Sequence, residues 1–339
     1  MKIFLYYILA MLYFQTNGTC SGLAKVLNRV SHDSLNRFLR RQWSGQKRLE
    51  AVIEPEKMKG GYLIIDDTPI EKPYSKKLEG LWWIYSSTER KVVYGYCLVL
   101  LIWTDGKIRI PIGLRLWRRG GKTKIELALE LLSHARNHLG LKPEYVFFDS
   151  WYASKKLFKR IKDYGWYFVT RLKRNRRFNG VSLNRIGWRN HFQGTGWISG
   201  GLKVKVVKND NKFLASNKLS LGRKEMERLY LIRSIIEEVN RILKQVCCLK
   251  GCQARSIEAQ EHHMWCSLFA FAVLERESKR LNMTVYKLRN DLCRRDSSLS
   301  LSLFVEYFPA IALFIADVSI NNATAGSKYL LNLSITRSP

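Results

Sequence analysis

The stretch that decides the fold is YLIRSIIEEVNRILK, residues 230–244. Within it, Tyr230, Arg233, Glu237 and Lys244 are separated by two, three and six residues. At about 100° of rotation per residue, the four positions fall within roughly 60° of arc on one face of a helix. The apolar residues between them supply a second face for packing. An acid beside two bases and a tyrosine suits a metal ligand next to phosphates.

Two upstream segments place acids directly after apolar runs. GYLIIDDT, residues 61–68, contains Asp66 and Asp67, and EYVFFDSWY, residues 144–152, contains Asp149. Both patterns predict a buried strand that delivers carboxylates at its end. Taken alone, the helix face also fits an ordinary solvated surface with ion pairs three and four residues apart. The upstream acids favour a functional site.

Asp66, Asp149 and Glu237 are the three acidic positions that stand out. Converging carboxylates would repel one another and raise each other's pKa unless a cation neutralised them. Oxygen-only ligands suit Mg²⁺ or Mn²⁺. Two such ions could stabilise the attacking and leaving oxygens of a phosphodiester. The sequence therefore predicts an acidic metal centre.

The charge of the chain indicates its partner. Its 339 residues include 58 Lys and Arg against 28 Asp and Glu, a net charge of +30. Such a charge favours polyanions, and the basic residues are spread along the chain among Trp, Tyr and Phe. That distribution indicates an extended nucleic-acid surface. Because no basic amphipathic anchor helix is evident, we expect DNA rather than a membrane as the partner.

Cysteine and histidine patterns point away from zinc, disulfides and export. Seven cysteines form no paired framework, which predicts a reduced, intracellular protein. The four cysteines and two histidines within residues 247–266 lack the close paired spacing of structural zinc sites, so we expect them to pack in the core. MKIFLYYILAMLYF, residues 1–14, resembles a short signal peptide. The cationic remainder favours a buried helix instead. His32, His134, His138 and His191 are scattered and suggest no metal site.

The remaining patterns describe strands alternating with helices. A phosphate-binding loop at 120–123 is rejected because position 116 is not glycine. The order describes an α/β protein with a central mixed sheet and helices on its faces. The expected elements are helices within 1–55, a strand at 61–68, a hairpin of strands at 91–103 and 107–117, a helix at 122–139, a strand at 144–152, a helix at 154–163, a strand at 166–171, a β-rich segment at 172–225, and helices at 226–247 and 256–280.

Two basic segments are candidates for DNA contact. Short helices on either side of Ser31, with arginines on the second, fit a helix-turn-helix or a plain helical hairpin that packs on the main domain. RLKRNRRF, residues 171–178, has five basic residues in eight. We expect Arg174, Arg176 and Arg177 to follow a DNA backbone, and the alternative is a solvated loop.

The acids and the helix together resemble a DDE transposase of a bacterial insertion sequence. The DDT at 66–68, the FDSWY at 148–152 and the Y-x2-R-x3-E-x6-K helix occur in the family's order, and the resemblance covers roughly residues 60–280. It implies a ribonuclease H-like fold, a mixed sheet flanked by helices, with a β-rich insertion before the last catalytic helix. It also implies cutting at element ends that depends on Mg²⁺, with Mn²⁺ as substitute, and transfer of the 3′-hydroxyls to target DNA.

The resemblance assigns the catalytic, metal-binding and DNA-binding residues. Asp66 matches the first acid, because Thr68 follows in the family's Asp-x-Thr/Ser pattern, and Asp67 is the alternative or a supporting carboxylate. Asp149 matches the second acid, although Trp151 stands where many relatives have a small residue. Glu237 matches the third. The accompanying phosphate-binding positions are Tyr230, Arg233 and Lys244.

Domains and partners follow from the same resemblance. We expect a helical N-terminal subdomain at 1–58 with possible DNA binding, a catalytic domain at 59–285 with its insertion at about 172–225, and a weakly defined tail at 286–339. The expected partners are terminal inverted repeats and target DNA, bound by a homodimer in the bacterial or archaeal cytoplasm, at the nucleoid. Trp188 and Trp197 are candidates for stacking on a flipped base, with ordinary packing the alternative. Two other functions stay open, a metal nuclease without strand transfer and an inactive DNA-binding remnant.

Overall fold

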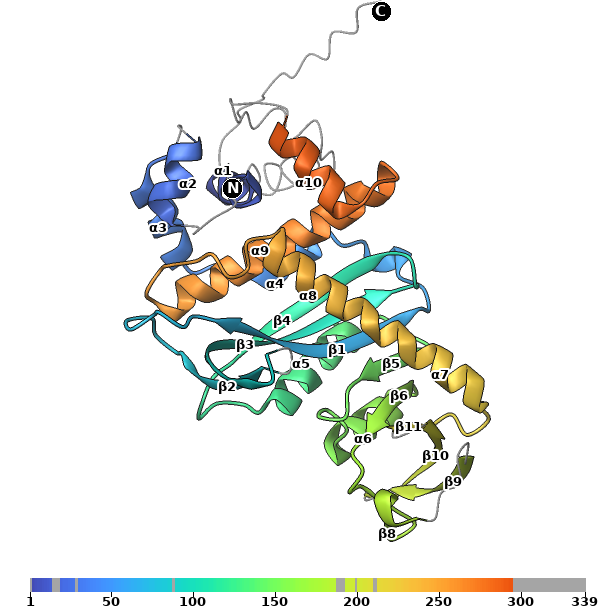
Figure 1. Cartoon of the computed structure of the whole chain (residues 1–339). Helices are drawn as coiled ribbons and strands as arrows, with labels where there is room; N and C mark the ends of the chain where they lie inside the picture. Colours follow the sequence, from blue (N-terminus) through green and yellow to red (C-terminus); the bar gives the residue numbers. More distant parts are fainter. Residues whose placement is uncertain are drawn as a thin grey trace, which may run out of the picture.

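The computed structural model describes residues 2–13, 19–27, 30–86, 89–186, 193–198, 200–209 and 212–294. The tail beyond residue 294, Trp188 and His191 lie outside this range. The architecture is a large mixed sheet with helices packed on it (Figure 1), and the expected α/β class is confirmed. No helix in the described ranges is long and apolar enough to cross a membrane.

The helices occur where the sequence predicts them, with one addition near the end. Each of α3, α4, α5, α6 and α9 begins at a Ser or Thr whose side chain accepts a backbone N–H three residues on. Helix α10 falls in the segment expected to be weakly defined. The helices are α1 Lys2–Tyr13, α2 Cys20–Leu27, α3 His32–Arg40, α4 Gly45–Glu50, η1 Pro55–Lys57, α5 Lys124–Asn137, α6 Lys155–Asp163, η2 Leu183–Arg185, α7 Arg223–Leu231, η3 Ile232–Ser234, α8 Ile235–Gln245, α9 Ile257–Arg280 and α10 Val285–Arg294.

The strands of the described residues form one sheet of eleven. Their order is β2-β3-β1-β5-β6-β11-β10-β9-β7-β8, and β4 pairs with β3 off this path. The segment at 172–225 is β-rich as expected, and its strand β11 pairs directly with β6. The strands are β1 Tyr62–Glu71, β2 Trp82–Ser86, β3 Lys91–Thr104, β4 Arg109–Trp117, β5 Tyr145–Phe148, β6 Tyr167–Leu172, β7 Arg177–Phe178, β8 Val181–Ser182, β9 Gln193–Ile198, β10 Leu202–Asn209 and β11 Lys212–Ser216.

Strand β1 is longer than its sequence pattern indicates. The strand is expected to end at its acids, but β1 continues to Glu71, because β3 pairs with it in antiparallel fashion along its whole length. The parallel pairing with β5 stops at Ile64 opposite Phe147. Asp66 and Asp67 therefore lie within a strand, just beyond the point where its parallel neighbour ends.

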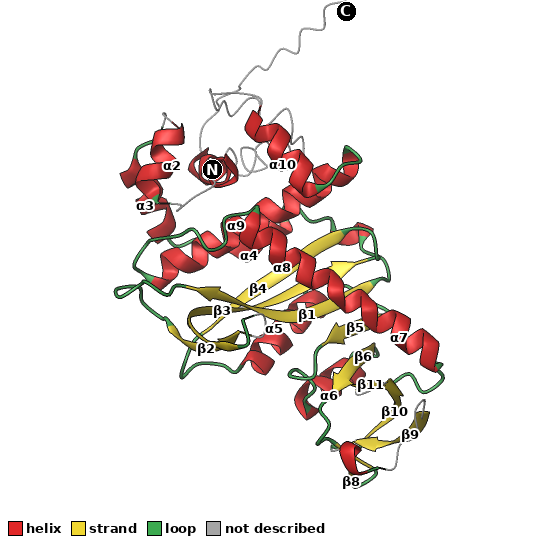
Figure 2. Cartoon of the chain, in the orientation of Figure 1, coloured by secondary structure: helices red, strands yellow, loops and turns green. Residues whose placement is uncertain are grey.

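The helix expected at 226–247 is divided by one turn. Helix α7 ends at Leu231, the 3₁₀ turn η3 follows, and α8 begins at Ile235. The hydroxyl of Ser234 donates a hydrogen bond to the carbonyl of Leu231 at 2.7 Å. Such local side-chain bonds compete with regular helix geometry. The helical direction continues across the turn (Figure 2).

The N-terminal helices and the sheet share one apolar core built around α9. Helix α1 is buried, as predicted, and Tyr7 shares a 2.8 Å hydrogen bond with His263 of α9. The other ring nitrogen of His263 lies 2.8 Å from the carbonyl of Cys248, and the ring of His262 stacks on Trp43. The histidines of the segment 247–266 are thus held by packing and hydrogen bonds, as expected for core residues.

Candidate active site between β1 and α8

The alternation of β1 separates its two adjacent acids. Successive residues of a strand point to opposite faces of a sheet. Asp66 faces the helical segment η3–α8, where its Oδ2 lies 3.8 Å from Nη1 of Arg233. Asp67 faces α5, where its Oδ2 accepts hydrogen bonds from Lys124 Nζ at 2.7 Å and from Cys97 Sγ at 3.3 Å. Only Asp66 is therefore directed at the predicted helix face.

The Asp66 carboxyl sits in a setting that calls for a cation. Burial raises its pKa to about 7, Arg233 opposes the rise, and the charges of Asp67 and Asp149 add to it. A carboxyl with such a pKa is about half protonated near neutral pH. A cation beside it would favour the ionised form.

Asp149 follows β5 and is fixed by its own turn. Its Oδ1 accepts hydrogen bonds from the backbone N–H of Trp151 at 2.9 Å and of Tyr152 at 3.3 Å. Burial raises the pKa of Asp149, and these N–H donors oppose the rise. The side chain of Trp151 is exposed, and its ring lies 5.1 Å from Lys124 Nζ. A large side chain at this position therefore needs no space in the core.

Arg233 lies between two of the predicted ligands. Its Nη2 donates to Oε1 of Glu237 at 2.5 Å, and its Nη1 faces Asp66. The Glu237 side chain is 55% exposed. Across the described ranges, no three His, Cys, Asp or Glu side chains are gathered closely enough to hold a metal ion. The guanidinium is the positive charge that contacts both Asp66 and Glu237.

Tyr230 and Lys244 lie on the same side of the helix. The Tyr230 ring is 5.9 Å from the guanidinium carbon of Arg233. Burial raises the pKa of Tyr230, Arg233 opposes the rise, and the charge of Asp149 adds to it. Burial lowers the pKa of Lys244, which the charge of Asp66 opposes. Tyr230, Arg233 and Lys244 therefore lie within electrostatic reach of the strand acids, and Glu237 is linked to them through Arg233.

Sequence reasoning missed the residues that support the site from the α5 side. Lys124 pairs with Asp67 across 57 residues of sequence, so no local pattern signals it. Tyr152 is fully buried, and its hydroxyl has no hydrogen-bond partner in the described structure. Burial raises the pKa of Tyr152, and the charges of Asp67, Cys97, Asp66 and Asp149 add to the rise. This hydroxyl is thus an unpaired polar group beside the acids.

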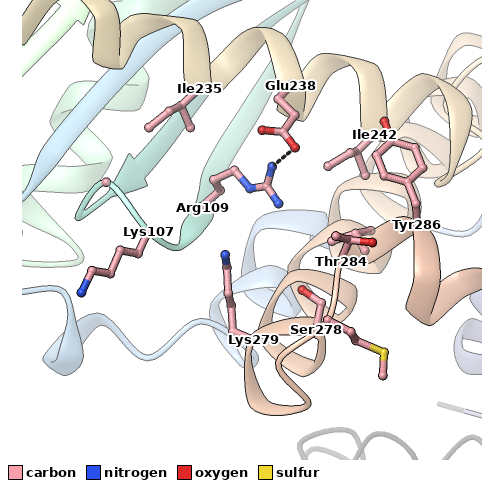
Figure 3. Close-up of a pocket in the computed structure, with 12 residues that line it drawn as sticks. Lys107, Arg109, Ile235, Glu238, Ile242, Ser278, Lys279, Thr284 and Tyr286 are labelled. Atoms are coloured by element: carbon pink, nitrogen blue, oxygen red, sulfur yellow. Dashed lines mark ion pairs between the residues drawn. The ribbon is translucent and has the colours of Figure 1, made fainter. Parts of the chain in front are cut away.

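The opposite flank of α8 is held by Arg109 from the start of β4 (Figure 3). Its Nη1 lies 2.7 Å from Glu238 Oε1, and its Nη2 lies 2.6 Å from Glu275 Oε2 on α9. The Glu275 side chain is 1% exposed and also accepts from the Nε and the backbone N–H of Arg109. The three side chains join α8, β4 and α9 beside a pocket of about 270 Å³ that Arg109 and Glu238 help to line.

The remaining predicted contacts lie on the chain from β6 to β9. In the segment 171–178, Arg174 and Arg177 are exposed, whereas Arg176 is half-buried over the ring of Phe158. Trp197 is exposed on β9.

Two of the histidines expected to be scattered lie together. His134 and His138 are four residues apart, their rings stack, and each approaches Glu50 at 3.0 and 3.1 Å. The expectation was wrong for this pair, because one helical turn brings such positions onto one face.

Comparisons with known proteins identify the family and the fold. The family model described as "Transposase DDE domain" matches residues 58–272. The cryo-EM structure of the piggyBac transposase synaptic complex with hairpin DNA is similar in fold, with a TM-score of 0.55 and 13% identity over 98% of this chain and 77% of that one. The NurA nuclease from Sulfolobus solfataricus aligns over 79% of this chain and 96% of its own, at 11% identity. Its TM-score of 0.24 is too low to indicate a shared fold. No curated protein matches in sequence.

Proposed function

The chain belongs to the transposase DDE domain family, and from this premise we propose that it cuts DNA at the ends of an insertion sequence and transfers the 3′-hydroxyl ends to target DNA. The ribonuclease H-like fold is confirmed by the structural match. The observation that carries the proposal is the partly buried Asp66 on β1, which faces Arg233 across the β1–α8 junction. Arg233 also pairs with Glu237, and Asp149 is the acidic neighbour of Asp66.

The family uses divalent metal ions, and carboxylate oxygens are the ligands that such ions prefer. Asp66, Asp149 and Glu237 would hold Mg²⁺, or Mn²⁺ in its place, in a site for two ions. The metal would supply Lewis-acid stabilisation of charge on the phosphodiester. The raised pKa of Asp66 and the cation already beside it fit such a site. Asp67, which is paired with Lys124 on the other face, is proposed as a supporting carboxylate.

The residues of the helix motif would bind and orient the DNA. Arg233 can exchange its carboxylate partners for a phosphate, because its fork binds both kinds of anion in a bidentate manner. Lys244 adds a point charge, and the hydroxyl of Tyr230 can donate to a phosphate oxygen. Arg174, Arg176 and Arg177 would follow the backbone further along. The attacking groups are a water and then the freed 3′-hydroxyl, so no covalent enzyme intermediate is required.

The partners and the location belong to the same proposal. Terminal inverted repeats and target DNA would be bound by a homodimer, so that two element ends are held together. The net charge of +30 supports polyanion binding. We place the protein in the cytoplasm of a bacterium or archaeon, at the nucleoid.

The test is cleavage and joining of labelled DNA that carries the element's terminal repeats, in Mg²⁺ and in EDTA. Glu237→Gln should abolish both reactions. Glu238→Gln is the matched control, because the adjacent side chain points about 100° away and contacts Arg109 instead. Nicking without joining would favour a stand-alone nuclease. Binding without any chemistry would favour an inactive remnant, and equal loss in both variants would exclude a specific role for Glu237.

A further inference from the structure

The hairpin of β2 and β3 has two unlike faces. On one face, Ile84 and Val93 pack with Cys97 in a small apolar cluster. On the same face the guanidinium of Arg119 lies 3.7 Å from the ring centre of Trp82. This face is therefore covered by the protein itself.

The other face presents uncovered rings. Trp83 lies opposite Tyr94, and Tyr85 lies opposite Val92. Trp83 is 61% exposed, Tyr85 63% and Val92 57%, and the rings of Trp83 and Tyr94 are 5.1 Å apart. A solvated face of an antiparallel pair is normally polar, and contiguous exposed apolar residues mark an interaction surface. We call these four residues the aromatic ladder.

The aromatic ladder lies on the side of the sheet that Asp66 faces. Asp66 is opposite Leu100 of β3, and residues two apart in a strand share a face. Tyr94 and Val92 are six and eight residues from Leu100 and belong to the same series. At about 3.3 Å per residue, Tyr94 is roughly 20 Å along the strand, the length of about six nucleotides of a DNA strand. DNA held at the acids can therefore reach the ladder.

Basic side chains occur in the chain segments next to the two strands of the ladder. Lys76 and Lys77 precede β2, Arg90 precedes β3, and Lys91 is the first residue of β3, on the face opposite to Val92. Lys76, Lys77, Arg90 and Lys91 are all exposed, and Lys91 lies 3.6 Å from Glu89. A cationic border opposes pairing of this face with a second copy of itself, because like charges would meet. It suits a polyanion with flat apolar groups, which describes a nucleic acid whose bases are accessible.

We propose that the aromatic ladder binds DNA with unpaired or unstacked bases beside the reacting end. Trp83 and Tyr85 stack on bases, and the bordering lysines and Arg90 contact phosphates. This inference rests on the proposed function, since it assumes that DNA occupies the site at Asp66. Figure 2 shows β2 and β3 at the end of the sheet opposite β9 and β8, so the ladder is separate from the β-rich segment at 172–225.

The experiment measures binding of a fluorescent mixed-sequence DNA, as a single strand and as a duplex, across a salt series. All proteins carry Glu237→Gln and are kept in EDTA, so cleavage does not enter. The double variant Trp83→Ala, Tyr85→Ala should weaken single-strand binding about tenfold or more and leave the salt slope unchanged, because stacking is not ionic. Lys76→Gln with Lys77→Gln should lower the salt slope by about two. Tyr167→Ala is the control, another exposed tyrosine, far from the ladder on β6.

The outcomes separate this inference from the proposed function. Unchanged single-strand affinity in the double variant, with normal binding by the parent, overturns the inference and leaves the proposed function standing. Equal loss in Tyr167→Ala also overturns it, since the effect is then not specific to the ladder. Unchanged affinity with a dimer that dissociates in sedimentation velocity would show a protein interface instead. A parent protein that binds neither DNA overturns both.

Discussion

Two arginines form ion pairs with adjacent glutamates of α8, and they differ in how deeply their second acidic partners are buried. Arg109 holds Glu238 on one flank of α8 and is anchored on the buried Glu275. Arg233 holds Glu237 on the other flank, where Glu237 is largely exposed and Asp66 is 3.8 Å away. The Arg109 contact is structural, because Glu275, its second partner, is buried away from solvent. The Arg233 contact is open to solvent, and under the proposed function it is exchanged for metal and phosphate.

The largest expected effect is on DNA cleavage, and it tests whether Asp66 rather than Asp67 is the metal ligand on the Arg233 side of α8. Asp66→Asn should lower DNA cleavage by more than about a thousandfold, because a metal ligand supplies several kcal/mol. Asp67→Asn should cost about 10- to 100-fold, the range for residues that support a ligand. Single-turnover cleavage in Mg²⁺ measures both. A larger loss in Asp67→Asn would reverse the assignment.

The Arg109 flank should dominate stability. Arg109→Ala leaves Glu275 as a buried, uncompensated charge, which costs about 3–5 kcal/mol in the free energy of unfolding. Urea unfolding of metal-free protein measures it. Glu275→Gln with Arg109→Met, which removes both charges, should recover part of the loss. An Arg109→Ala protein as stable as wild type would show that the contact does not hold α8.

The stability of the metal-free protein should depend on pH through the Asp66 carboxyl, which lies on the Arg233 side of α8. The folded pKa of Asp66 is about 7, above an unfolded value of about 3.9, so the native state retains a proton that the unfolded state has lost. The stability of metal-free protein should therefore fall as pH rises between these values. Relative to wild type, the free energy of unfolding of Asp66→Asn should increase through that window, by about 1.4 kcal/mol per pKa unit. The difference should then stay constant at higher pH. Urea unfolding at about pH 4 and about pH 7, roughly the two ends of the window, tests the sign.

The smallest expected effect concerns the exchange at Arg233. Arg233→Ala should tighten binding of Mn²⁺ to DNA-free protein several-fold, since the guanidinium no longer competes for Asp66 and Glu237. The same variant should weaken DNA binding, because a phosphate ligand is lost. Calorimetry measures the affinity for Mn²⁺, and fluorescence anisotropy measures the affinity for DNA. Weaker metal binding would mean that Arg233 organises the acids rather than occupying their place.

Local patterns carried much of the fold. Apolar periodicity placed the principal helices and long strands. A shift in register on β4 brings Ile102 opposite Pro111, a residue that cannot donate a ladder hydrogen bond. Patterns failed where the deciding partner is distant in sequence. Strand β1 runs past its acids because β3 continues to pair with it, and η3 interrupts the helix through a hydroxyl that no periodicity reports.

The sequence by itself determined the candidate residues of the site and the helix face that carries four of them, because 3.6-residue periodicity is local and chemical type is fixed. It also determined the positive charge and, through the motif order, the family. Only the tertiary structure decided which of two adjacent aspartates faces the helix. Strand alternation places Asp66 and Asp67 on opposite faces of the sheet, but the packing of α8 on one face and α5 on the other decides which aspartate meets which helix. The same holds for Lys124 beside Asp67 and for Arg109 on Glu275. Those contacts join segments that meet solely through the packing of the sheet between its helices.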